Sequence, residues 1–218
     1  GGNVPASGEK SGATDFFLVA RPNGDQGRDT LCNIVAQRLP AKGFSPNKIQ
    51  VLAPMRRGPL GTNILNEVLQ QRLNPHGERV ARRDREYRVG DRVICTRNRY
   101  DVEIFNGDIG RITAHDEDGL IVDFDGRRVD WTWEETDILE LAYAITIHKS
   151  QGSEYDAVVL ALHGSHSIML RRNLFYTGVT RARRFLCVIG DQRAWQIAAG
   201  RTGGDERYSW LCKRLRDQ

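Results

Sequence analysis

The sequence predicts an α/β fold in which helices cover a parallel sheet and a small antiparallel domain is inserted. Apolar, strand-like segments alternate with helical patterns near both ends of the chain, which is typical of a parallel sheet. In the middle of the chain the apolar period drops to two. The pair Asp125-Gly126 lies in that middle part and is a strong signal for a two-residue hairpin turn.

The N-terminal part reads as strand, helix, strand, helix. Strands are expected at 16–20 (FFLVA) and 49–54 (IQVLAP), because both are short apolar runs. A helix is expected between them that ends before Pro40, with apolar residues at helical spacing: Leu31, Ile34, Val35 and Leu39. Thr62 is expected to cap a second helix, whose apolar side carries Ile64, Leu65, Val68, Leu69 and Leu73.

The middle segment, 82–137, is predicted to form a small antiparallel β-barrel inserted into the α/β domain. Asn106-Gly107 marks a further turn, and Val129, Trp131 and Trp133 alternate, so they share one face of a strand. Tryptophans on such a face fit either a barrel core or a surface on which bases stack. The organisation is then a linker at 1–14, a discontinuous α/β domain at 15–81 and 138–218, and the insertion.

The α/β pattern returns after Leu139. Strands are expected at 157–162 and 185–190, a helix between them at 174–184, and two final helices at 192–199 and 207–216. The helix at 174–184 would place Thr177, Arg181 and Arg184 on one flank, beside its apolar face. A cation held stiffly there would suit charge that develops in phosphoryl transfer. Pairing of Arg181 with an acid of its own domain is the alternative.

Composition limits the function classes. The net charge is +4, the sequence pI is about 9.0, and arginine dominates the cations, which favours phosphate-bearing partners. No apolar run is long enough to span a membrane and no signal segment opens the chain, so we expect a cytoplasmic protein. The four cysteines are far apart and are expected to be free thiols, and the pair His163 and His166 lacks the further ligands of a zinc site.

A second polar segment surrounds Gly152. It combines hydroxyl, amide, imidazole and charged groups within nine residues: Thr146, His148, Lys149, Ser150, Gln151, Ser153 and Glu154. Such donors beside a glycine that permits close backbone approach can bind a phosphate or a sugar. The same pattern also fits an ordinary helix end, with Gly152 as its C-terminal stop.

Taken together, these segments resemble the superfamily 1 helicases, specifically the RecD-like branch. "TIHKSQGSEYDAVVL" is similar to helicase motif V, "LFYTGVTRARRFLCVIG" to motif VI, and "VLAPMRRGPLGTNILNEVL" to motif IV. "RNRYDVEIFNGDIGRI" resembles the barrel insertion of the same enzymes. The resemblance covers about residues 16–198. It implies the second RecA-like domain of a 5′→3′ DNA helicase, with an inserted barrel of the Src-homology-3 (SH3) type.

The resemblance also implies roles for individual residues. Arg181 matches the motif VI arginine finger, and Arg57 or its neighbour Arg56 matches a motif IV residue that faces the same phosphates. Gly152 and Glu154 correspond to positions near the nucleotide. The implied DNA contacts are Thr146, His148, Lys149 and Gln151. Separately from the resemblance, Arg97 and Arg99 lie among cations and aromatic residues of the barrel that could form a strand-binding surface. The cofactors implied for the full-length enzyme are ATP and Mg²⁺.

One departure from the family pattern concerns the nucleotide loop. The sequence has no GxxxxGK[ST], and its only tempting acidic motif, "HDEDG" at 115–119, looks like a hairpin tip. We therefore expect the C-terminal part of a longer helicase, which needs an N-terminal RecA-like domain and cannot hydrolyse ATP alone. The expected partner is single-stranded DNA, no membrane is expected, and membership of a nuclease complex stays open. Two alternatives remain: the helicase part of a conjugative relaxase, or a stand-alone nucleic-acid-binding module.

Overall fold

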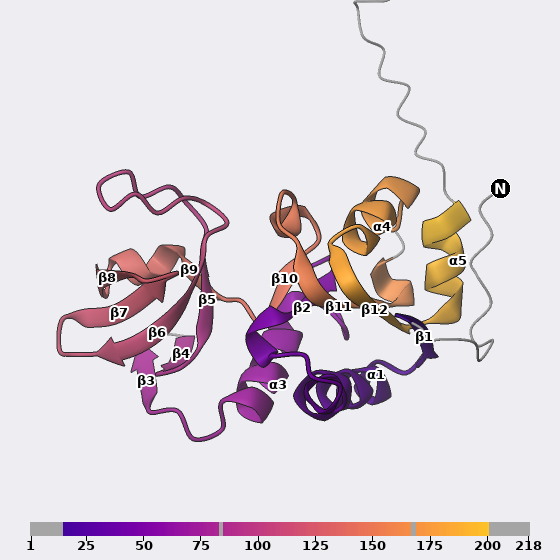
Figure 1. The fold of residues 1–218 in the computed structure, drawn as a ribbon, viewed down its shortest axis with the longest axis horizontal. Helices are drawn as coiled ribbons and strands as arrows, with labels where there is room; N and C mark the ends of the chain where they lie inside the picture. Colours follow the sequence, from indigo (N-terminus) through magenta and orange to yellow (C-terminus); the bar gives the residue numbers. More distant parts are fainter. Residues whose placement is uncertain (1–14, 83–84, 167–168, 201–218) are drawn as a thin grey trace, which may run out of the picture.

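The chain folds into a parallel α/β domain and an antiparallel β domain that lie side by side (Figure 1). This is a computed structural model that describes residues 15–82, 85–166 and 169–200. The predicted linker at 1–14, the predicted helix at 207–216 and Cys212 lie outside the described residues. None of the helices in the described ranges has the length and apolarity that crossing a membrane requires.

Five parallel strands form the sheet of the α/β domain. In spatial order they are β1 (Phe16–Ala20), β12 (Ala182–Gly190), β11 (Tyr155–Leu162), β2 (Ile49–Ala53) and β10 (Ala144–Thr146). The central strand β11 is fully buried from Ala157 to Leu162, as expected of a parallel sheet that is covered on both faces. The predicted α/β class is therefore confirmed.

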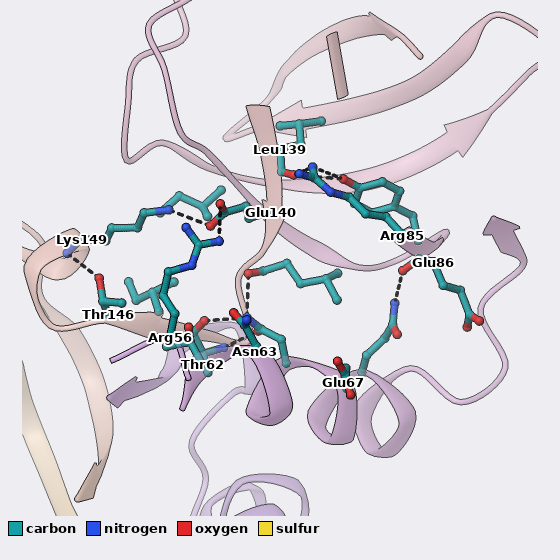
Figure 2. Close-up of a pocket in the computed structure, with 17 residues that line it drawn as sticks. Arg56, Thr62, Asn63, Glu67, Arg85, Glu86, Leu139, Glu140, Thr146 and Lys149 are labelled. Carbon is teal, nitrogen blue, oxygen red and sulfur yellow. Dashed lines mark hydrogen bonds and ion pairs between the residues drawn. The ribbon is translucent and has the colours of Figure 1, made fainter. Parts of the chain in front are cut away.

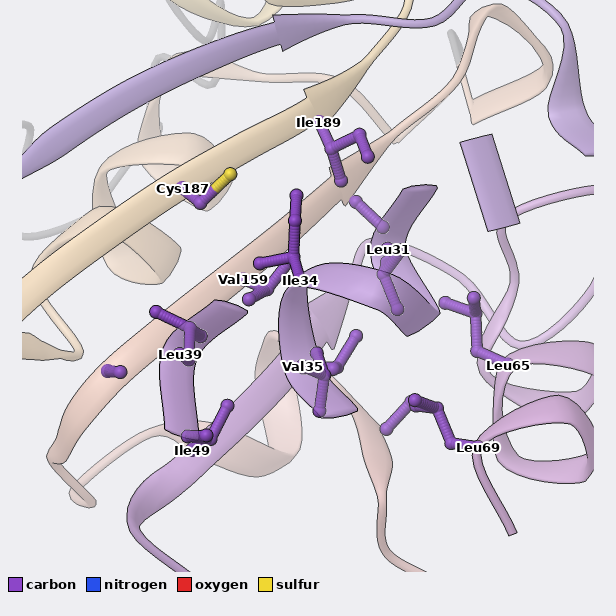
Figure 3. Close-up of a cluster of buried hydrophobic side chains, with 14 of the residues drawn as sticks. Leu31, Ile34, Val35, Leu39, Ile49, Leu65, Leu69, Val159, Cys187 and Ile189 are labelled. Carbon is purple, nitrogen blue, oxygen red and sulfur yellow. The ribbon is translucent and has the colours of Figure 1, made fainter. Parts of the chain in front are cut away.

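Helices bury both faces of this sheet. One face is covered by α1 (Gly24–Asn33), the π-helical η1 (Ile34–Arg38), α2 (Leu39–Ala41) and α3 (Thr62–Leu73), and the other by α4 (Arg172–Val179) and α5 (Gln192–Gly200). Alternation along β11 supplies both cores, because Val159 joins the first cluster and Val158 the second. Figure 3 shows the first cluster, in which Leu31, Leu65 and Leu69 are fully buried.

Three predictions of helix boundaries are wrong. The first helical segment continues past Pro40, because a new α-helical turn starts at Leu39 and proline is tolerated in a first turn. The N-cap of α3 is Gly61, and Thr62 is already helical. The helix predicted at 174–184 ends at Val179, and the chain enters strand β12 at Ala182. Arg181 thus lies in the turn between α4 and β12.

The inserted domain consists of antiparallel strands. Its five-stranded sheet has the order β8 (Arg127–Thr132), β7 (Gly119–Phe124), β6 (Ile109–His115), β5 (Arg92–Cys95) and β9 (Leu139–Leu141), and a hairpin joins β3 (Arg79–Arg82) to β4 (Arg85–Arg88). The predicted segment 82–137 lies within this span. Asp125 and Gly126 form the predicted turn, both with positive φ, and "HDEDG" is a hairpin tip. Trp131 is a buried core residue, whereas Trp133 is half-buried.

A buried polar network joins the two domains. The Asp91 carboxylate, which is inaccessible to solvent, accepts hydrogen bonds from Gln70 (2.6 Å) and Asn74 (2.8 Å) on α3, from the Tyr143 hydroxyl (2.8 Å), and from the backbone N–H of Arg88 (2.7 Å). Burial and the neighbouring Asp91 raise the pKa of Tyr143, so its hydroxyl remains a donor. This carboxylate ties the inserted domain to the first helical layer.

A second contact of the junction starts from Arg92 at the beginning of β5. Its guanidinium donates to the backbone oxygen of Ile49 (3.0 Å) and to the side-chain oxygen of Gln50 (2.9 Å) on β2. The Gln50 amide in turn donates to the carbonyls of Ala142 (3.3 Å) and Tyr143 (3.2 Å). Since Arg92 of β5 and the backbone that follows β9 are both bonded to β2, the junction is fixed by hydrogen bonds as well as by the chain connections.

Candidate functional site

The turn that carries Arg181 lies at the amino end of the parallel strands. The backbone N–H of Tyr155, the first residue of β11, donates to the Arg181 carbonyl (2.8 Å). The half-buried guanidinium donates to the Thr177 carbonyl (3.1 Å), the Ser153 carbonyl (3.0 Å) and the Thr180 hydroxyl (3.1 Å). These partners are neutral, and no carboxylate of the described chain forms an ion pair with Arg181. The side chain is therefore held in place while its charge is not neutralised.

Gly152 and Glu154 lie on the segment that leads into the same turn. Gly152 has φ +85°, a left-handed conformation that favours glycine, and open space surrounds its Cα. The Glu154 carboxylate accepts from the Arg183 guanidinium (2.7 Å), which lowers the pKa of Glu154. Glu154 thus pairs with Arg183, whereas Arg181, two residues away, forms no ion pair with it and adds only a smaller electrostatic effect on the pKa of Glu154.

We expect Gly152→Ala to destabilise the chain by about 1 kcal/mol, because an L-residue is strained at positive φ. Steric clash contributes nothing, since no atom lies within 4 Å of the added Cβ. Gly200→Ala is the matched control, because Gly200 is helical and also has open space around it. Urea unfolding measures both variants. If the two variants unfolded at the same urea concentration, the proposed backbone strain at position 152 would be contradicted.

A second group of polar side chains surrounds a pocket of about 480 Å³ at the edge of the sheet, next to the inserted domain (Figure 2). Glu140 on β9 is one of its lining residues and lies between two cations. One carboxylate oxygen of Glu140 binds Arg56 (2.7 Å) and the other binds Lys149 (2.9 Å). Burial raises the pKa of Glu140, but the bonds from Lys149 and Arg56 outweigh it, so the pKa falls below its usual value.

Other elements contribute to the wall of this pocket. Thr62, Asn63, Asn66, Glu67 and Gln70 come from α3, Arg85, Glu86 and Tyr87 from β4, and Thr146 from the end of β10. Asn66 is fully used within the fold, because its amide donates to the Leu141 and Ala144 carbonyls and its oxygen accepts from the Ala144 N–H. Arg85 donates to three carbonyls of the inserted domain. The cations of the lining that are not bonded to backbone carbonyls are Arg56 and Lys149, both paired with Glu140.

Two other residues that were predicted to contact DNA face a smaller cavity. His148 and Gln151 are exposed and line a space of about 340 Å³ together with residues of α4, among them Asn173 and Thr177. His148 opens the short helix η4 (His148–Ser150) and Gln151 follows it, where the chain leads back from the carboxyl end of β10 towards the start of β11. The structure thus brings Thr146 and Lys149 together in one cavity and places His148 and Gln151 in another.

The structure does not bring Arg57 and Arg181 together. Arg181 precedes Ala182, which pairs with Tyr155, whereas Arg57 follows Leu52, which pairs with Leu160 five residues further along β11. At about 3.3 Å per residue these levels are about 17 Å apart, and Arg57 lies beyond the second. The Arg57 side chain is exposed and has no hydrogen-bond or ion-pair partner among the described residues. The two arginines therefore point to different ligands or to different parts of a long one.

The two predicted DNA-binding arginines of the inserted domain also differ: Arg99 is ion-paired within the domain, whereas Arg97 is exposed. Arg99 binds Asp101 (2.6 Å) and Glu135 (3.0 Å) and lies 5.0 Å from the centre of the Trp131 ring, so its charge is used within the domain. Arg97 is exposed on the long loop between β5 and β6. Tyr100 (74% exposed) and Phe105 (47% exposed) stand on the same loop with ring centres 6.2 Å apart. This loop presents one cation and two aromatic rings to solvent.

Two features of the candidate site were not predicted from the sequence. Glu140 carries no motif signal, and its position between Arg56 and Lys149 depends on the pairing of β9 with β5 across the inserted domain. The second is the separation of Arg57 from Arg181, which the alternation of strands and helices could have indicated. A residue after a parallel strand and a residue before one lie at opposite edges of the sheet.

Family models match the two domains separately. Residues 65–124 match the SH3 domain of ATP-dependent RecD-like DNA helicases, and residues 141–189 match the UvrD-like helicase C-terminal domain. The first match includes most of α3, so it extends from the inserted domain into the helix that Asp91 binds. The second includes Lys149, Gly152, Glu154 and Arg181.

Curated relatives and solved structures agree with these matches. The ATP-dependent RecD2 DNA helicase of Deinococcus radiodurans is 46% identical over 171 residues (78% of this chain, 24% of that protein), and the RecBCD enzyme subunit RecD of Haemophilus influenzae is 33% identical over 171 residues (78% and 26%). A Pif1 helicase structure, described as DNA unwinding at forked duplex DNA by two coordinating Pif1 helicases, superposes with a TM-score of 0.52 at 18% identity, covering 88% of this chain and 52% of that chain.

The match to the relatives is partial in length. The chain spans about a quarter of the length of these two curated relatives, 24% and 26%. The Pif1 likeness, at its low identity, concerns the fold alone: a parallel sheet with helices and a separate antiparallel sheet. The predicted resemblance is confirmed, and in its two matched domains the chain belongs with the RecD-like DNA helicases.

Proposed function

We propose that the chain is the second motor domain of an ATP-dependent 5′→3′ DNA helicase, in which Arg181 completes a nucleotide site formed with another RecA-like domain. The proposal rests on the fixed position of the Arg181 side chain and on its lack of an ion-pair partner among the described residues. A phosphoryl-transfer arginine must be positioned in advance and must keep its charge available for the transferred phosphate. Three neutral acceptors position Arg181, and no carboxylate of the described residues neutralises it.

Gly152 and Glu154 support the same assignment, because they lie beside Arg181 at the amino end of the strands. ATP and Mg²⁺ are the cofactors of the proposed enzyme. The phosphate loop and the Mg²⁺ ligands belong to the other RecA-like domain, so the 218-residue chain on its own does not hydrolyse ATP. Arg181 then acts in trans to that domain, and closure of the two domains brings it to the phosphates.

We infer that the cavity around Glu140 receives the backbone of single-stranded DNA. Arg56 and Lys149 line it, Thr146 adds a hydroxyl, and the unpaired Arg57 belongs to the same loop as Arg56. Because Arg57 lies at the far edge of the sheet from Arg181, its position supports contact with DNA better than contact with the nucleotide. His148 and Gln151 extend the proposed DNA contacts along the sheet towards α4.

The inserted domain adds a third proposed contact through the loop between β5 and β6. Arg97 supplies a cation, and the exposed rings of Tyr100 and Phe105 supply surfaces on which bases stack. Arg99 supports this loop from within, through Asp101 and Glu135. Since one relative is a RecBCD enzyme subunit, assembly with nuclease subunits is a further proposal for the whole protein.

Binding of a fluorescein-labelled oligothymidylate to this chain tests the DNA site. We expect Arg57→Ala to weaken binding roughly fivefold at about 0.1 M salt and to reduce the log–log salt slope by about 0.7, as expected for the loss of one phosphate contact. Lys42→Ala is the matched control, because Lys42 is exposed and lies over the Phe17 ring, outside the pocket. If both variants lost affinity equally, the loss would reflect net charge and the proposed DNA path would be rejected.

A further inference from the structure

Glu140 occupies the position that a phosphate needs in the proposed DNA pocket. It lies on β9, the last strand of the inserted domain before the chain returns to the parallel sheet. Its two carboxylate oxygens each bind one cation, Oε1 to Arg56 and Oε2 to Lys149 (Figure 2). A phosphodiester also presents two charged oxygens. The carboxylate therefore satisfies the same two donors that a DNA phosphate would use.

We propose that Glu140 acts as an internal competitor of DNA: it binds Arg56 and Lys149 in the DNA-free chain and must release at least one of them when a phosphate enters. This inference rests on the proposed DNA pocket and adds a regulating residue to it. Because Glu140 offsets part of the positive charge of Arg56 and Lys149, the DNA-free domain has a lower affinity for a phosphate backbone. A strand can then be released in each cycle instead of staying bound.

Exposure and charge favour competition over permanent pairing. The side chains of Glu140 and Lys149 are each 26% exposed and that of Arg56 is 56% exposed, so solvent and a strand can reach all three. Arg56 is the exposed partner, and ion pairs of exposed side chains are weak, so Arg56 can exchange Glu140 for a phosphate at low cost. The group formed by Glu140, Arg56 and Lys149 keeps one unbalanced positive charge, while the further carboxylates of the lining, Glu67 and Glu86, lie on α3 and β4.

The location of Glu140 connects this exchange to the inserted domain. Glu140 pairs with Ile94 on β5, and Arg85 is bonded to the carbonyl of the preceding residue, Leu139. Arg56 and Lys149, in contrast, come from the loop after β2 and from η4 of the parallel domain. The two ion pairs thus cross from one domain to the other, and an entering phosphate would exchange an interdomain contact for a DNA contact.

The test compares Glu140→Gln with the unchanged chain in binding to a fluorescein-labelled oligothymidylate over a range of salt concentrations. Glutamine keeps the shape of the side chain and removes the competing charge. We expect binding to tighten about fivefold at about 0.1 M salt and the salt slope to steepen by about 0.7, because one cation becomes available to the DNA. Circular dichroism confirms that the variant is folded. Glu140→Ala provides a second variant and should tighten binding in the same way.

Glu67→Gln is the matched control. Glu67 lines the same pocket but has no ion-pair partner among the described residues, so its replacement changes the charge without releasing a cation. We expect it to alter affinity less than twofold. In a Lys149→Ala, Arg56→Ala background, the gain from Glu140→Gln should disappear. Equal tightening by Glu67→Gln, or weaker binding by Glu140→Gln, overturns the competitor role.

The two proposals fail in different ways. If Lys149→Ala and Arg56→Ala leave DNA binding unchanged, the pocket is not the DNA site and the proposed function of these residues fails, together with the competitor. If these two variants weaken binding while neither Glu140→Gln nor Glu140→Ala tightens it, the pocket remains a DNA site. Glu140 then positions the cations instead of competing for them.

Discussion

Replacing Arg181 with alanine, in a complete helicase that includes a nucleotide-binding first domain, is expected to lower the turnover number for DNA-stimulated ATP hydrolysis about 10³-fold. Nucleotide binding should change little, because the arginine acts on charge that develops only in the transition state. Steady-state ATPase assays and nucleotide-binding titrations measure the two quantities. Normal turnover in the alanine variant would contradict the role given to Arg181.

Two further variants separate charge from geometry. Arg181→Lys keeps the charge but loses the planar fork that donates to Thr177, Ser153 and Thr180, so most of the activity should still be lost. Arg184→Ala is the matched control three residues further along, on β12, since this exposed side chain lies over the Phe44 ring and at 4.0 Å from Asp156. We expect Arg184→Ala to retain turnover within about threefold.

Replacing Asp91 with alanine is expected to destabilise the chain by about 3–5 kcal/mol. The change removes the common acceptor of Gln70, Asn74, Tyr143 and the Arg88 N–H, and leaves these donors unsatisfied inside the junction. Urea unfolding followed by circular dichroism measures the loss. Because the network spans both domains, the unfolding transition should also become less cooperative.

Asp130→Ala is the control for Asp91→Ala. Asp130 is on the exposed side of β8, and its replacement should change the free energy of unfolding by less than about 0.5 kcal/mol. The loss of stability in Asp91→Asn should lie between those of Asp91→Ala and Asp130→Ala. Asparagine keeps one acceptor oxygen, but its amide nitrogen is a donor that faces other donors. A loss at Asp91 no larger than at Asp130 would contradict the view that this carboxylate fixes the junction.

The sheet was predictable because burial dictates its pattern. The apolar run AVVLAL forms the covered central strand and FFLVA a partly buried edge strand, and Asp125-Gly126 has the residues that a two-residue hairpin turn requires. The end of α4 was not predictable in this way. Residues 174–184 keep helical spacing of apolar residues beyond Val179, but pairing with β1 and β11 recruits the chain from Ala182 into a strand.

The sequence predicts candidate site residues but not how they are arranged. The motif segments named Arg181, Gly152, Glu154 and Lys149, and the structure describes all four. Their partners depend on pairing between distant segments, which local sequence does not encode. The Ser153 carbonyl reaches Arg181 across 28 residues, and Glu140 reaches Arg56 across 84.

The position of the Arg181 guanidinium in a complete helicase bound to ADP, a metal fluoride and single-stranded DNA tests the central claim most directly. The account predicts that at least one guanidinium nitrogen lies within about 3 Å of the metal fluoride, the stand-in for the transferred phosphate. It also predicts that Arg181 keeps the Thr177 contact that holds it. A guanidinium that remains on the Ser153 carbonyl, with the metal fluoride bound by other arginines, would contradict it.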